Sequence, residues 1–66
     1  MFTSQILYFT DSQGNVLLTL KKPSFVPKAN EQVIINGDKR KIYYVHQVVY
    51  TVEKNKYTCW VYLNDL

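Results

Sequence analysis

The sequence of 66 residues, with 47% hydrophobic and 15% aromatic content, suffices for one folded domain, residues 1–66, and is too short for a second core. The net charge of +3 permits contact with nucleic acid or an acidic protein but requires neither. No apolar run approaches the roughly 18 residues of a membrane helix. Residues 1–5 lack the features of a secretory signal, and the single Cys cannot form an internal disulfide. We therefore expect a cytoplasmic protein.

The first half of the chain predicts a β-hairpin followed by an irregular segment. Residues 2–10 and 16–20 are rich in strand-forming types, and the turn formers of residues 11–15 separate them. The alternation in the second strand places three aliphatic residues on one face: Val16, Leu18 and Leu20.

The segment 22–30 contains Pro23 and Pro27, which exclude a helix and a central strand because each proline lacks a backbone donor. Between the prolines lie Phe25 and Val26. We expect both side chains to cover an open end of the sheet as part of the core, with a ligand clamp as the alternative.

A second hairpin follows, with a short strand at 32–36 and a tight turn at Asn36-Gly37. The next strand runs over residues 40–52, well above the usual length of about five or six, so it must bend. Its apolar positions change phase across His46 and Gln47, which predicts a β-bulge there.

The last strand is predicted at residues 57–63, after a polar turn at 53–56. We expect one face of this strand to enter the core, because Cys, Val and Leu are commonly buried. The residues on that face are Tyr57, Cys59, Val61 and Leu63. Trp60 and Tyr62 then lie on the outer face or at an edge.

These five strands predict an all-β fold: a five-stranded antiparallel small barrel, closed so that no strand edge is exposed. An OB-like arrangement or an open sheet stays as an alternative, because the pattern does not give the order of the strands in space. The segments 26–37 and 43–48 resemble small bacterial and phage SH3-like β-barrels. In those proteins a proline and an acidic residue lead into a Val-x-Ile-x-Gly strand and then a Tyr-x-Val strand, as they do here. The resemblance covers about half of the chain. It implies a fold and transfers no functional residue.

Catalysis has little support in the sequence. Cys59 and His46 could lie on neighbouring strands, but Cys59 falls on the predicted core face, where a thiol is inert. The carboxylates show no acid–base or metal-ligand spacing; they are Asp11, Glu31, Asp38, Glu53 and Asp65. We expect no enzyme, no cofactor and no metal.

Two binding functions remain open. The first is a module that binds a larger host or cognate protein, as a phage or mobile-element adaptor or inhibitor; its candidate residues are Trp60, Tyr62, Tyr44 and Arg40. The alternative is a single-stranded nucleic-acid-binding barrel that uses basic and aromatic residues, namely Lys39, Arg40, Lys41, Lys54, Lys56 and Tyr43. A homo-oligomer is compatible with either function.

Overall fold

A computed structural model describes residues 4–37 and 39–66, and the predicted residues 2, 3 and 38 lie outside this description. The five predicted strands are confirmed, and the second, fourth and fifth are slightly longer than expected. Their bounds are β1 Ser4–Thr10, β2 Val16–Lys21, β3 Gln32–Asn36, β4 Arg40–Glu53 and β5 Lys56–Asp65. Among the described residues there is no helix with the length and apolar character needed to cross a membrane.

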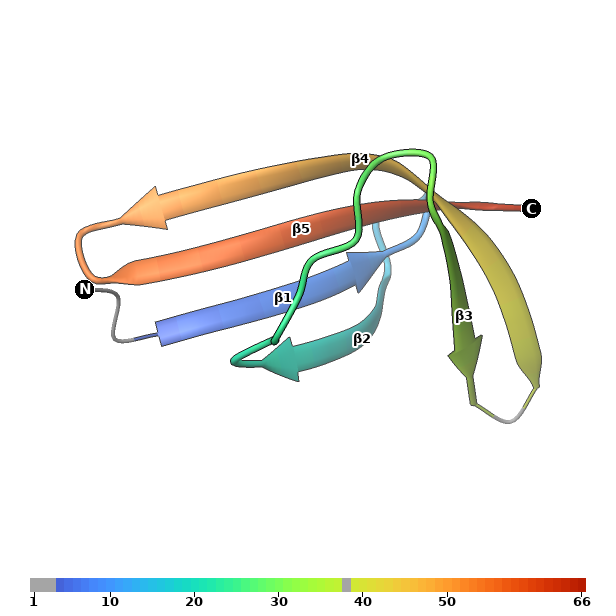
Figure 1. Ribbon diagram of the computed structural model, residues 1–66, viewed down its shortest axis with the longest axis horizontal. Coiled ribbons are helices and arrows are strands. Elements are labelled where there is room, and N and C mark those ends of the chain that lie inside the picture. Colours follow the sequence, from blue (N-terminus) through green and yellow to red (C-terminus); the bar gives the residue numbers. More distant parts are fainter. Residues whose placement is uncertain (1–3, 38) are drawn as a thin grey trace.

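The five strands form one sheet in the order β2-β1-β5-β4-β3 (Figure 1). The prediction of a purely antiparallel sheet is wrong, because β1 and β5 run parallel at its centre. The predicted closure is also wrong: in the part of the chain that the structure describes, β2 and β3 are the two edges of a curled, open half-barrel. Turn signals reveal hairpins between consecutive strands, but nothing local in the sequence encodes the pairing of the first strand with the last.

The bend of β4 arises at the predicted bulge. Val45 pairs with Leu63 and Gln47 pairs with Tyr62, so His46 is an extra residue without a partner in β5. An extra residue bends its strand and reverses the alternation of side chains beyond it. The first half of β4 therefore pairs with β3, while the second half runs alongside β5 (Figure 1).

The core lies on one face of the sheet, which we call the core face. Its buried residues are Leu7, Phe9, Tyr43, Val45, Cys59, Val61 and Leu63. Residues 22–31, which we call the strap, carry the chain across this face from β2 to β3 (Figure 1). Val26 packs against the core, as predicted, and a hydrogen bond from the Asn30 amide to the Val45 carbonyl (2.8 Å) ties the strap to β4. The prediction is wrong for Phe25, whose side chain projects outward and is 75% exposed.

The edge strand β2 differs from the others because every one of its residues is exposed. Leu18 and Leu20 pair with Phe9 and Leu7 of β1 and share the core face. A register shift next to Phe9 then pairs Val16 with Thr10, so Val16 leaves the face on which the alternation predicted it.

Candidate functional site

The sheet has a second face, opposite the core, on which aromatic side chains from three strands gather. We call it the outer face. Alternation and register place on it Ile6, Tyr8 and Thr10 of β1, Thr58, Trp60, Tyr62 and Asn64 of β5, and Tyr44 and Val49 of β4. The strap contributes no cover here, because it contacts the core face.

A stacked aromatic pair lies at the centre of the outer face. The parallel register of β1 and β5 sets Tyr8 directly beside Trp60. Their ring centroids are 4.5 Å apart with an interplanar angle of 24°, and both residues are half-buried. Such pairs stabilise a fold by about 0.5–1.5 kcal/mol beyond the area that they bury. The stack therefore holds the indole in one orientation with part of its surface exposed to solvent.

A second contact fixes the aromatic side chain of β4. Tyr44 and Asn64 are partners in the β4–β5 register, and the Asn64 Nδ2 donates a hydrogen bond to the Tyr44 hydroxyl at 3.1 Å. Tyr62 precedes Asn64 on the same face and is also half-buried. The outer face thus presents Tyr8, Trp60, Tyr62 and Tyr44 on rigid strands.

The structure brings together three of the four residues predicted to bind a protein partner. Trp60 and Tyr62 lie on the outer face, as the alternation of β5 predicted, and the β4–β5 register adds Tyr44 to it. Arg40 is exposed but lies at the start of β4, where it pairs with Asn36 next to the turn, four residues before Tyr44. A separation of four residues in a strand is roughly 13 Å.

Sequence reasoning missed Tyr8 as a residue of this face, whereas the alternation of the last strand had already placed Asn64 beside Trp60 and Tyr62. The alternation of β1 separates Tyr8 from Leu7 and Phe9, and that signal could have placed it opposite the core. Its contact with Trp60 depends on the parallel pairing of β1 and β5, for which no local signal exists.

The basic residues of the nucleic-acid hypothesis lie in two separate groups. Lys39 lies in the turn before β4, and Arg40 and Lys41 are the first two residues of that strand. Lys54 lies in the β4–β5 turn, and Lys56 is the first residue of β5. These turns lie at opposite ends of a molecule whose longest extent is 36 Å (Figure 1).

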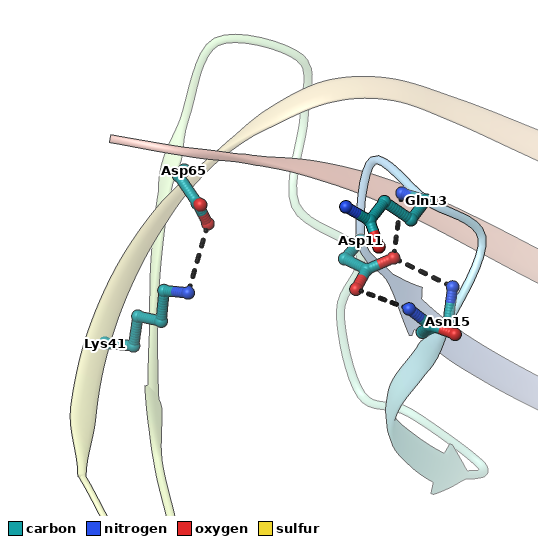
Figure 2. A network of polar contacts seen from close by, with 5 residues as sticks. All are labelled: Asp11, Gln13, Asn15, Lys41 and Asp65. Atoms are coloured by element: carbon teal, nitrogen blue, oxygen red, sulfur yellow. Dashed lines mark hydrogen bonds and ion pairs between the residues drawn. The ribbon is translucent and has the colours of Figure 1, made fainter.

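Lys41 and the aromatic residue of that hypothesis, Tyr43, have contacts on the core face. The Lys41 Nζ is 3.4 Å from an Asp65 carboxylate oxygen (Figure 2) and 5.3 Å from the centroid of the Tyr43 ring. The negative charge of Asp65 raises the pKa of Lys41. Tyr43 itself is only 7% exposed, so little of its ring is available for stacking with a base.

Cys59 and His46 lie apart, although their strands are neighbours. Cys59 is fully buried opposite Tyr50, and burial raises the pKa of its thiol, which disfavours the nucleophilic thiolate. His46 is exposed at the bulge, beside the position where β4 pairs with Leu63. Leu63 lies four residues after Cys59 in β5. Among the described residues, no group of three or more His, Cys, Asp or Glu side chains is placed to hold a metal ion.

A pocket lies between the strap and β3. Phe25 and Pro27 of the strap line it together with Val33 and Ile34 of β3.

Comparisons with protein-family models, with curated proteins and with solved structures found no match.

Proposed function

We propose that this chain is a non-catalytic binding module that recognises another protein through its outer face. The observation that carries the proposal is the stacked, partly exposed Tyr8–Trp60 pair at the centre of that face. Tyr62 and Tyr44 extend the aromatic surface on either side of the bulge. Trp and Tyr are enriched among the residues that contribute most to the affinity of protein interfaces.

The rigidity of this surface favours binding. Association costs free energy when side chains become ordered at the interface, by about 0.5–1.5 kcal/mol for each immobilised flexible side chain. Here Trp60 is already stacked on Tyr8, and Tyr44 is already hydrogen-bonded to Asn64. A partner that docks on these rings therefore gains contact area at a small entropic cost.

A protein partner fits this face better than a nucleic acid does. Binding of single strands needs bases stacked on aromatic rings and phosphates neutralised by neighbouring cations. The exposed rings lie in the middle of the sheet, whereas Lys39 and Arg40 lie at one end of the molecule and Lys54 and Lys56 at the other.

We place the partner in the cytoplasm as a larger host or cognate protein. The resemblance to bacterial and phage barrels supports a role as an adaptor or inhibitor encoded by a phage or mobile element.

The proposal is tested by capture with matched aromatic variants. Tagged wild-type chain, Trp60→Ala and Phe25→Ala are each immobilised and exposed to extracts of the native cells, and circular dichroism confirms that all three are folded. We expect a protein that binds the wild type and Phe25→Ala but is lost with Trp60→Ala. In calorimetry with that purified protein, Trp60→Ala should weaken affinity by roughly 30-fold or more, equivalent to about 2 kcal/mol.

Phe25→Ala is the appropriate control because Phe25 has the most exposed aromatic side chain among the residues that the structure describes, and it belongs to the pocket beside the strap. Capture that survives Trp60→Ala but fails with Phe25→Ala would move the binding site to that pocket. Capture of nucleic acid alone, removed by nuclease treatment, would refute a protein partner.

A further inference from the structure

The edge strand β2 carries a long apolar surface, and its one charged residue, Lys21, lies at its C-terminal end. All six of its residues are exposed, including Val16, Leu17, Leu18 and Leu20 at 37–50%. Native proteins shield edge strands with charges, prolines or covering segments, because an exposed apolar edge pairs with other chains. The stretch 16–20 contains no charge and no proline. An edge of this kind is expected to be paired in solution.

The hydrogen bonds of β2 show which of its backbone groups are available. The Lys22 amide donates to the Gln5 carbonyl of β1 at 2.9 Å. Because the direction of these groups alternates along a strand, Leu20 and Leu18 also direct theirs to β1. Thr19 and Lys21 therefore direct their N–H and C=O groups away from the sheet, where a further strand can bind them.

We propose that β2 pairs antiparallel with β2 of a second copy of this chain, about a twofold axis at Thr19, so that two half-barrels form one continuous sheet. In this register Thr19 of one copy is hydrogen-bonded to Thr19 of the other. Leu18 and Leu20 of one copy then lie opposite Leu20 and Leu18 of the other on the core face. Thr–Thr and aliphatic pairs directly across two antiparallel strands stabilise a sheet.

The charges at the two ends of β2 favour the antiparallel arrangement. Lys21 and Lys22 lie at its C-terminal end. At its N-terminal end lies Asp11, whose carboxylate accepts hydrogen bonds from the backbone amides of Gln13 (2.9 Å) and Asn15 (2.8 Å; Figure 2). Antiparallel pairing brings the lysine end of each copy beside the acidic turn of the other, whereas parallel pairing sets lysines beside lysines.

The other sheet edge, β3, is a less suitable partner for β2. Its core-face residues Val33 and Ile35 are already partly buried against the core, whereas the core-face leucines of β2 are exposed. Pairing of β2 with β3 of another copy is also not self-complementary: a dimer of this kind must form two such contacts at once, and any other arrangement gives larger rings or open chains.

The proposed dimer has a consequence that rests on the proposed function. A twofold axis perpendicular to the sheet leaves the outer faces of both copies on the same side of the assembly. Two Tyr8–Trp60 stacks would then point in one direction, and the module would bind bivalently to a dimeric or repetitive partner.

Disulfide cross-linking tests both the contact and its register. Residues that form a hydrogen-bonded antiparallel pair have Cα atoms about 5.5 Å apart, which lies within the range that a disulfide spans. We expect Thr19→Cys to form a covalent dimer under mild oxidation, while the native Cys59 stays unreactive because it is fully buried. Thr51→Cys, an exposed position on β4, and Lys21→Cys, roughly 13 Å from its copy in this register, should remain monomeric.

Proline substitution tests the backbone pairing independently of cysteine chemistry. Thr19→Pro removes an amide that points away from β1, whereas Thr19→Ala keeps it. Sedimentation should show a dimer for the wild type and Thr19→Ala, and at least tenfold weaker association for Thr19→Pro, with circular dichroism unchanged.

The proposal is overturned by a monomeric wild type at millimolar concentration, by dimers that tolerate Thr19→Pro, by cross-linking of all three cysteine variants alike, or by assemblies larger than a dimer. None of these readouts involves Trp60, so they remain distinct from the test of the proposed function.

Discussion

Two neighbouring strands, β1 and β2, both have alternating apolar residues, but the core-face side chains of β1 are buried and those of β2 are exposed to solvent. Leu7 of β1 and Leu20 of β2 are direct partners on the core face, yet Leu7 is fully buried and Leu20 is 39% exposed. The difference comes from their positions, because β1 is flanked by β5 and β2 while β2 is an edge. An alternating pattern thus shows that a strand has an apolar face, and the sheet order decides whether anything covers it.

The largest expected effect comes from truncating this matched pair. Leu7→Ala should lower the free energy of unfolding by about 2–5 kcal/mol, because it leaves a cavity among buried side chains. Leu20→Ala should cost less than about 1 kcal/mol, since much of that side chain is already in water. Urea unfolding at concentrations where the chain is monomeric measures both values. Equal losses at the two positions would show that β2 is covered within a single chain.

An intermediate effect is expected from the aromatic stack on the outer face. A double-mutant cycle with Tyr8→Leu, Trp60→Leu and the double variant should give a coupling free energy of about 0.5–1.5 kcal/mol in unfolding experiments. The rings are 4.5 Å apart, close enough for direct interaction. A control cycle between Trp60 and Phe25, which belongs to the strap pocket, should give no coupling. Zero coupling between Tyr8 and Trp60 would argue against the parallel β1–β5 register.

The smallest effect concerns the turn that leads into β2. Backbone hydrogen bonding, chiefly from the Asn15 amide, lowers the pKa of Asp11 below its ordinary value of 3.8. A lowered folded-state pKa means that the charged form stabilises the fold above the ordinary pKa, and that this stabilisation is lost as the pH falls through the folded value.

Thermal unfolding of the monomeric chain from pH 7 to pH 2.5 measures this contribution. The difference in Tm between the wild type and Asp11→Asn should be largest above pH 4 and should shrink at lower pH. A difference that does not change with pH would show that the carboxylate charge contributes nothing to the turn.

The local parts of this fold could be predicted from the sequence. The five strands, the turns and the bulge at His46 follow from residue types and alternation, because those signals depend on neighbours in the chain. The burial of Cys59, Val61 and Leu63 was predicted in the same way, and so was the position of Trp60 on the opposite face.

The parts that could not be predicted depend on contacts between distant segments. The parallel pairing of β1 with β5 brings together strands from the two ends of the chain, and no turn residue encodes it. That pairing determines the sheet order, the open edges and the contact of Tyr8 with Trp60. The exposure of Phe25 escaped prediction for a similar reason, since the path of the strap depends on the edge strands that it connects.

The most direct test of the outer face as the contact surface is the salt dependence of affinity for the captured partner. We predict that the dissociation constant changes little between 50 and 500 mM NaCl, and that Trp60→Ala weakens binding by roughly 30-fold at every salt concentration. Replacement of Lys39, Arg40 and Lys41 together by Ala should have a much smaller effect. A steep loss of affinity with salt, matched by the triple variant and not by Trp60→Ala, would contradict the account and assign binding to the basic ends of the molecule.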